Sequence, residues 1–199
     1  TYIFECEATN EIGIQGSPSS QVMITVDTVP PYAEINITNW VNETSFEVRW
    51  TGTDFSGSGI STYFLEYKEM NGSRLVRDWA SLGEKLWPET SLRFTGAVNG
   101  HTYYFRVRAE DNAGNIGEEP AIFKINIDLK AEPPDVISST HPKSDKYYSN
   151  KKPVFIVDRV DDLSGMDGFY YVVDKNPDTI PNKKTGKFVK DTTINIEEE

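Results

Sequence analysis

Residues 103–109 carry the strongest structural signal in the chain: they read Tyr103-Tyr104-Phe105-Arg106-Val107-Arg108-Ala109. Every second side chain is apolar, and arginines stand at two of the positions between them. A period of two, with one apolar face and one polar face, is typical of a strand in an antiparallel sheet that packs on one side only. The segment therefore predicts a half-buried β-strand.

The same pattern occurs 101 residues earlier, where residues 2–8 read Tyr2-Ile3-Phe4-Glu5-Cys6-Glu7-Ala8. A second similarity links Ser58-Gly59-Ile60 with Ser164-Gly165-Met166. Self-similarity at a fixed spacing indicates structural repeats, so we predict a tandem array of units of about 100 residues. Further positions that match at the 101-residue spacing are Gly13 with Gly114, Gly16 with Gly117, Ile24 with Ile125, and Asp27 with Asp128.

Proline pairs mark the boundaries of these units, at Pro30-Pro31 and Pro133-Pro134. Proline fixes φ and restricts the residue before it, so both pairs are expected to act as stiff linkers. Residues 1–28 are predicted to be the last strands of a preceding unit, residues 29–130 a complete unit, and residues 131–199 the first strands of a following unit. The chain is thus expected to be a segment of a longer protein.

The central unit contains several alternating stretches that resemble the first one. Phe46, Val48 and Trp50 share one face of residues 44–50, and Glu47 and Arg49 share the other. About seven short strands separated by turn signals in a unit of this size indicate a β-sandwich. We therefore predict an all-β chain of tandem antiparallel β-sandwiches, one complete and two partial. The turn signals are Asn71-Gly72, Asn99-Gly100 and Asn112-Ala113-Gly114.

Composition excludes several classes of function. The 199 residues carry a net charge of −11, which argues against a nucleic-acid partner. No apolar run approaches the roughly 20 residues that span a bilayer, so we expect no membrane insertion in this segment. The single cysteine excludes an intrachain disulfide and a thiolate zinc site. With only two histidines and no nucleophile or phosphate-binding motif, we predict no enzyme activity and no resident cofactor.

The central unit resembles a fibronectin type III domain. Trp50 matches the core tryptophan of that family's second strand, residues 63–67 match its third strand, and Tyr103 matches the tyrosine-corner residue. More narrowly, the segments 27–31, 54–60 and 108–115 resemble fibronectin-type or immunoglobulin-like repeats of prokaryotic surface and secreted proteins. The resemblance implies a sandwich fold but no single activity, because this fold carries unrelated functions. The structural core is expected to contain Trp50, Tyr63, Leu65, Tyr103, Phe105 and Val107.

Acidic side chains are the first candidate site. In this fold, Asp27 in the linker, Asp54 in one loop and Asp111 with Asn112 in another are expected to converge at the domain junction. Gathered oxygen ligands suit Ca²⁺, so calcium is the one cofactor that this pattern supports. The alternative is that these side chains cap turns by bonding nearby backbone amides, which is the more common role of Asp and Asn.

Two other groups are candidate sites for carbohydrate. Trp79 and Trp87 would stack on sugar rings, or else pack against the sandwich edge. Asn36, Asn42 and Asn71 each begin an Asn-X-Ser/Thr sequon, which fits an exported protein, although Asn, Ser and Thr are common throughout the chain. Cys6 is expected to be a buried small apolar residue, and His101 a surface turn residue.

The partial units at the two ends are complementary halves of a sandwich. Residues 1–28 would supply the last two strands and residues 133–199 the first five. Strand complementation between two chains would then give a swapped dimer or an open fibre. The alternative is that these fragments pack on the central unit or belong to a larger molecule.

The leading hypothesis is a non-catalytic extracellular repeat segment of a larger cell-surface or secreted protein. It would act as a spacer, an adhesion module or a protein-interaction module. Its partners would be proteins or cell-surface glycans. The alternatives are carbohydrate-contacting accessory modules of a secreted hydrolase, and a receptor-like pair of ligand-binding domains.

Overall fold

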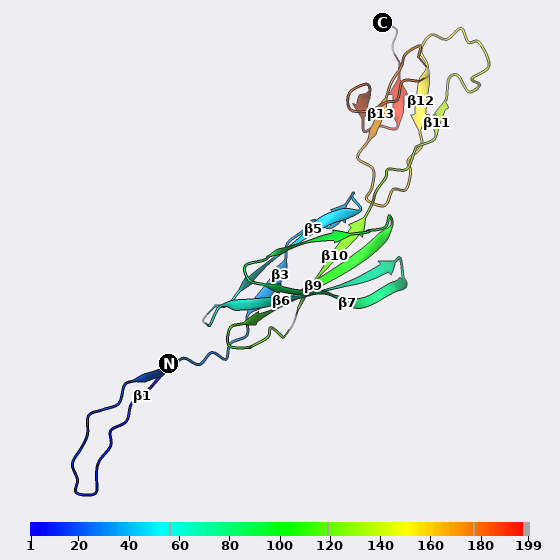
Figure 1. Cartoon of the computed structure of the whole chain (residues 1–199). Coiled ribbons are helices and arrows are strands. Elements are labelled where there is room, and N and C mark those ends of the chain that lie inside the picture. The colour runs from blue at the N-terminus through cyan, green and yellow to red at the C-terminus, as the bar shows by residue number, and fades with distance from the viewer. Residues whose placement is uncertain (56, 119, 177, 197–199) are drawn as a thin grey trace. The chain divides into compact units, whose positions relative to one another are not determined.

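The computed structural model describes residues 1–55, 57–118, 120–176 and 178–196. All regular structure in these residues is β-strand, so the predicted all-β class is confirmed (Figure 1). The chain divides into two compact units, Thr1–Ile127 and Asp128–Glu199. The boundaries predicted after residues 28 and 130 stay predictions. No helix that could cross a bilayer occurs in the described part of the chain.

The first unit contains a sandwich of two sheets, visible in the middle of Figure 1. One sheet has the order β3-β5-β8 and the other the order β4-β10-β9-β6-β7. The first comprises β3 (Tyr32–Ile35), β5 (Ser45–Thr53) and β8 (Ser91–Thr95). The second comprises β4 (Trp40–Val41), β6 (Ile60–Asn71), β7 (Arg74–Leu86), β9 (His101–Asp111) and β10 (Ala121–Ile127).

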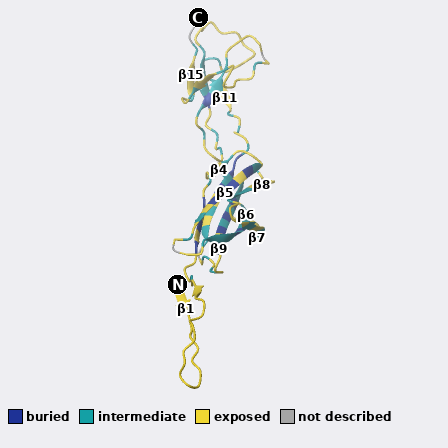
Figure 2. Cartoon of the chain, turned by 60° about the vertical axis from the view of Figure 1, so that its left-hand side comes forward, coloured by how far each residue is buried: buried dark blue, intermediate teal, exposed yellow. Residues whose placement is uncertain are grey.

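The alternating strands form the core, as their pattern predicts. In β5 the inward residues Phe46, Val48 and Trp50 are buried while Glu47 and Arg49 are exposed. Figure 2 shows the same alternation of dark blue and lighter residues across the sandwich. Aromatic rings fill much of the space between the sheets, because a large ring buries more apolar surface than any aliphatic side chain. The structure buries all six residues expected in the core: Trp50, Tyr63, Leu65, Tyr103, Phe105 and Val107.

One strand departs from the expected antiparallel arrangement. β4 pairs with β10 in parallel, with Trp40 opposite Asn126. The chain reaches this position because β3 pairs with β5 in the first sheet, after which the segment around Asn39 crosses to the second sheet. There the backbone N–H of Asn126 donates to the carbonyl of Asn39 at 2.8 Å. The first strand of the domain is thus divided between both sheets.

Residues 1–26 form a hairpin of β1 (Tyr2–Phe4) and β2 (Val22–Ile24), shown in yellow in Figure 2 because it is exposed throughout. Its apolar side chains, such as Phe4 at 65%, remain accessible on both faces. The expectation that Cys6 is buried was wrong: this residue is exposed. The segment does alternate as a half-buried strand would, but within the described chain no second sheet covers its apolar face.

In the described residues of the second unit, five strands form two small sheets. That these are the first strands of a further fibronectin-like unit stays a prediction. Val157, Phe169 and Ile194 form its buried core. One sheet has the order β11-β12-β15, and the other pairs β13 with β14. The bounds are β11 (Val136–Ser138), β12 (Val154–Val157), β13 (Phe169–Tyr171), β14 (Lys187–Val189) and β15 (Thr193–Asn195).

Candidate functional site

Three aspartates meet at the pole of the sandwich where the linker enters. Asp27 precedes the first proline pair, Asp54 follows β5, and Asp111 ends β9. One carboxylate oxygen of each lies within 4.8 Å of those of the other two. The sandwich fold produces this arrangement because the ends of β5 and β9 and the chain entry all lie at this pole. Calcium binding at this cluster stays a prediction.

Asp27 fastens the linker to the domain that follows it. Its Oδ1 accepts a hydrogen bond from the backbone N–H of Val29 at 3.1 Å, and its Oδ2 accepts one from Ser58 at 2.6 Å. These two bonds stabilise the charged form and hold the pKa of this carboxyl below its usual value. Asn115 adds a bond from its side-chain amide to the Asp27 carbonyl at 3.2 Å. We call the contact between Asp27 and the Ser58 loop the linker latch.

Asp111 is almost completely buried, and both of its oxygens accept hydrogen bonds within its own turn. Oδ1 accepts from the backbone of Ala113 and Asn115, and Oδ2 accepts from the Asn115 side chain at 2.7 Å. This is the turn-capping role that the sequence offered as the alternative to metal binding. The Asp111 carboxylate is therefore stabilised by neighbouring donors.

Asp54 differs from the other two carboxylates. Its Oδ2 accepts from the backbone N–H of Gly59 at 2.7 Å, but its Oδ1 is buried and has no hydrogen-bond partner. A buried carboxylate oxygen without a donor or a cation costs free energy. Gly57 lies directly against the cluster, because a Cβ placed there would stand 2.6 Å from Asp54 Oδ2 and closer still to Asp27. The loop therefore requires glycine at this position.

Asn112, the fourth predicted ligand, holds the loop by a different contact. Its side-chain Nδ2 donates to the carbonyls of Ser58 and Gly59, at 2.9 and 3.0 Å. Three of the four predicted ligands are thus brought together as carboxylates. The fourth ties the Ser58 loop to the end of β9 through its amide nitrogen.

A second linker latch occurs within the second unit. Asp128 Oδ1 accepts from the backbone of Lys130, and its Oδ2 accepts from the backbone of Ser164 at 3.1 Å. Asp162 accepts from Glu132 and again from Ser164. The bond to Glu132 is the main cause of the lowered pKa of the Asp162 carboxyl. Asp27 and Asp128, which match in the sequence repeat, therefore make the same kind of contact: each accepts hydrogen bonds from the backbone of its linker and of a serine in the loop that follows.

The three sequon asparagines are all exposed. Asn36 follows β3, Asn42 lies between β4 and β5, and Asn71 ends β6 at its turn to β7. These positions leave the side-chain amide accessible to a glycosylating enzyme. Glycosylation itself stays a prediction.

The two candidate sugar-binding tryptophans differ in accessibility. The guanidinium of Arg106 lies 4.1 Å from the ring centroid of Trp79, so it covers one face of that indole. Arg106 is itself held by Glu66 at 2.6 Å. Trp87 is 54% exposed, and its ring lies 6.5 Å from that of Tyr63. Trp87 therefore has the more accessible surface for stacking.

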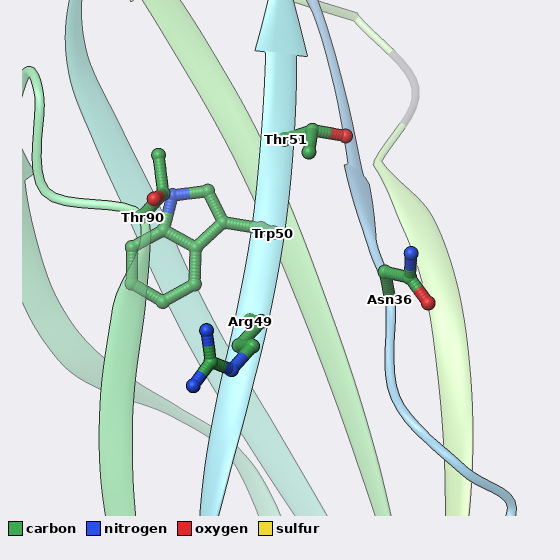
Figure 3. A pocket seen from close by; sticks show the side chains of 5 residues that line it. All are labelled: Asn36, Arg49, Trp50, Thr51 and Thr90. Carbon is green, nitrogen blue, oxygen red and sulfur yellow. The ribbon is translucent and has the colours of Figure 1, made fainter.

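A pocket of about 380 Å³ lies beside β5, and Figure 3 shows the side chains that line it. Asn36 and Thr51 lie on one side of the strand, and Trp50 and Thr90 on the other. Arg49 is its one titratable residue, and Glu47 already pairs with it at 2.5 Å. General acid–base chemistry needs at least one group that can exchange a proton near neutral pH. The pocket as described provides none.

A polar cluster inside the domain was not predicted. His101 Nδ1 lies 2.7 Å from Glu69 Oε1, and the Tyr103 hydroxyl donates to the same oxygen at 3.0 Å. The expectation of a surface role for His101 was wrong, since its side chain is only 15% exposed. The signal was in the sequence: Glu69 continues the inward series Tyr63, Leu65 and Tyr67, and an inward carboxylate needs partners.

The comparisons with known proteins agree with the geometry of the sandwich. The sequence model of the fibronectin type III domain family matches residues 30–124. This segment is a fibronectin type III domain, as its resemblance implied. The narrower resemblance to prokaryotic repeats stays a prediction.

Two long proteins of animals are similar to part of this chain. One is "M-protein, striated muscle" of Gallus gallus, 31% identical over 119 residues, or 57% of this chain. The other is "Myomesin-2" of Homo sapiens, 28% identical over 123 residues, or 59% of this chain. The chain spans 8% of the length of each relative.

Two solved structures of fibronectin-type modules are similar to part of this chain. The fibronectin(III)-like modules of Clostridium thermocellum CbhA have a TM-score of 0.38 at 19% identity, over 65% of this chain and 64% of theirs. The third fibronectin III domain of human KIAA0343 protein has a TM-score of 0.36 at 20% identity, over 59% of this chain and 98% of its own.

Proposed function

We propose that the chain is a non-catalytic protein-interaction and spacer segment of a longer protein located outside the cell. Fibronectin type III modules commonly mediate protein interactions, and residues 30–124 form one. The proposed partners are proteins or surface glycans.

The linker latch is the observation that carries the spacer role. Asp27 bonds to Ser58, and Asp128 bonds to Ser164, so each linker aspartate is tied to the unit that follows it. A proline pair follows each of these aspartates in the sequence and restricts the backbone of the linker. These hydrogen bonds reduce the conformational freedom of the linker backbone. A less flexible linker suits a segment that spaces other parts of a protein.

Domain replacement in the native protein tests this proposal. Residues 29–130 would be replaced by an unrelated fibronectin type III domain, or by a Gly/Ser linker of equal length. A spacer keeps its function with the foreign domain and loses it with the flexible linker. An interaction module loses it with both. Full function with the Gly/Ser linker would contradict both roles.

The proposed extracellular location rests on the exposure of Asn36, Asn42 and Asn71. Treatment of the native protein with an N-glycosidase should lower its mass, and each Asn→Gln variant should remove one step of that change. External protease should also cleave the protein on intact cells. A protein that is both unglycosylated and protected from external protease would contradict this location.

Calcium binding at the aspartate cluster is a second proposal, favoured by the unpartnered Oδ1 of Asp54. A Ca²⁺ ion there would offset two of the three negative charges of the neighbouring carboxylates and satisfy that oxygen. A ligand that binds only the folded state raises the melting temperature. We expect Ca²⁺ to raise it in the wild type and in Glu84→Gln, an exposed control, but not in Asp54→Asn. Equal shifts in all three proteins would contradict the site.

The alternative of a carbohydrate-contacting module in a secreted hydrolase is supported by the exposure of Trp87. Binding to insoluble polysaccharide should then fall with Trp87→Ala. Trp79→Ala should reduce it less, because Arg106 already covers one face of that ring. No binding by the wild type would contradict this alternative.

A further inference from the structure

The connection between β11 and β12 is a basic segment in an acidic chain. We call residues 139–153 the lysine loop; it projects beyond the two strands that it joins (Figure 1). It contains four lysines and one acidic residue, Asp145, so its net charge is +3, whereas the whole chain carries −11. A group of like charges attracts ions of the opposite sign. The lysines, all of them exposed, are Lys143, Lys146, Lys151 and Lys152.

Hydrogen bonds within the lysine loop give it a defined conformation. The two ring nitrogens of His141 lie 2.8 Å from the hydroxyl of Thr140 and 2.8 Å from the carbonyl of Asn150, so this ring joins the two halves of the loop. The hydroxyl of Tyr148 accepts a hydrogen bond from the backbone N–H of Lys143 at 2.9 Å. The rings of His141 and Tyr148 meet edge to face, with centroids 4.7 Å apart. The lysines therefore extend from an ordered backbone.

Tyr147 provides an aromatic surface on the same loop. Its side chain is fully exposed, although its neighbour Tyr148 takes part in holding the loop. A tyrosine ring offers a large, rigid contact area and loses little conformational freedom when it binds a partner. Tyr147 directly follows Lys146 in the sequence. The loop therefore presents an accessible ring next to a positive charge.

The charges of the second unit are segregated along β12. The lysine loop precedes this strand, and Asp158 follows it. The backbone N–H of Asp158 donates to the carbonyl of Asp135 at 2.9 Å, so residues 128–135 and 158–162 approach each other at the opposite end of the strand. These two segments contain six acidic and two basic residues, so they repel anions while the lysine loop attracts them. The acidic residues are Asp128, Glu132, Asp135, Asp158, Asp161 and Asp162.

The residue types of the lysine loop favour one kind of anion. The loop contains no arginine, which is the preferred side chain for phosphate and nucleic-acid recognition. Lysine ammonium groups act as point charges on flexible stems, so they pair with carboxylates or sulfates without a fixed geometry. A polymer of sugar rings that bears such groups offers charges to the lysines and a ring face to Tyr147.

We propose that the lysine loop binds an anionic polysaccharide. Tyr147 packs against a sugar ring, and Lys146 and Lys152 pair with the carboxylate or sulfate groups on either side of it. The inference specifies the chemistry of the surface glycans named in the proposed function, and in that respect it rests on that function. It assigns the contact to the second unit, outside the segment that matches the fibronectin type III family.

Binding of the full chain to polygalacturonate, which carries carboxylates, and to heparin, which also carries sulfates, tests the proposal. We expect the wild type to bind at least one of them, and to bind less tightly as the salt concentration rises. The double variant Lys146→Gln/Lys152→Gln should lower the affinity by about tenfold. Arg93→Gln/Lys124→Gln is the matched control, because it changes the net charge equally at exposed positions of the first unit. No binding by the wild type, or an equal loss in both double variants, would overturn the proposal.

A second measurement separates a polysaccharide from an acidic polypeptide. Polyglutamate carries carboxylates but no sugar rings, so the wild type should bind it less tightly than the polysaccharides. Tyr147→Ala should weaken binding to the polysaccharides, whereas Tyr2→Ala, at an exposed tyrosine of the first unit, should not. A wild type that binds polyglutamate at least as tightly as both polysaccharides would overturn the proposal and identify an acidic polypeptide as the partner.

This inference and the proposed function fail separately. Replacement of residues 29–130 tests the spacer and interaction roles and leaves the lysine loop unchanged. The lysine and tyrosine variants test the polysaccharide site and leave the central domain unchanged. A chain that binds no anionic polysaccharide would therefore lose this site, while the result of the domain replacement would still stand.

Discussion

Tyr103 joins two parts of the sandwich through one hydroxyl group. That oxygen accepts a hydrogen bond from the backbone N–H of Val98 at 3.2 Å and donates to Glu69. Burial, followed by the Glu69 carboxylate, raises the pKa of Tyr103 from 10.0 to about 12. Since the raised pKa favours the protonated form in the folded state, this contribution is fully present below pH 10 and is lost as pH rises through 12.

Tyr103→Phe should therefore reduce stability at neutral pH and flatten the alkaline pH dependence. Loss of the hydroxyl removes one net hydrogen bond, worth about 1 kcal/mol, and leaves Val98 without its acceptor. Chemical denaturation at pH 7 and between pH 10 and 12 would measure both effects. Tyr147→Phe, at a fully exposed ring, is the control. An unchanged alkaline transition in Tyr103→Phe would contradict the role of this hydroxyl.

Asp27 gives the opposite pH dependence. Its pKa is lowered in the folded protein, mainly by the bonds from Val29 and Ser58. Its contribution is therefore present above the ordinary carboxyl pKa and is lost as pH falls through the lowered value. Asp27→Asn should lower the melting temperature at pH 7 and reduce the further loss between pH 5 and pH 2. A melting temperature that Asp27→Asn does not change at pH 7 would exclude a stabilising latch.

At the scale of elements, the close crossing of β5 and β6 depends on one small residue. A Cβ on Gly52 would stand 2.6 Å from both the Tyr63 hydroxyl and the Ile60 side chain. Gly52→Ala should therefore destabilise the domain by about 1–3 kcal/mol, as overpacked sites do. Thr51→Ala, at the exposed neighbour, should cost much less. Equal denaturation midpoints for the two variants would show that Tyr63 moves aside freely.

The sequence predicted most of the strands because their inward and outward residues alternate. Trp50, Tyr63 and Phe105 all face the core, as a period of two requires. The parallel pairing of β4 with β10 could not be predicted, since two residues are too few to show a period. Cys6 followed the right pattern, but its burial depends on a sheet that only a second molecule or further chain can supply. The predicted aspartates are far apart in the sequence. They lie close together because the topology of the sandwich brings their loops to the same pole.

At the scale of the whole molecule, each unit has a core of its own. The first is built around large rings such as Trp50 and Phe105. Among its described residues, the second has a smaller buried core of Val157, Phe169 and Ile194. Because burial of apolar surface dominates stability, the second unit should unfold first on heating. Calorimetry should therefore show two transitions. A single transition would contradict this expectation.

The two linker latches also bear on how such a chain can evolve. Asp27 reaches Ser58 across 31 positions and Asp128 reaches Ser164 across 36, so the contact survives a change in loop length. Each duplicated segment carries its own fastening aspartate and its own receiving loop. When a gene gains or loses whole repeats, each remaining repeat therefore keeps the hydrogen bonds that hold its own linker. No new mutation is needed where two repeats join.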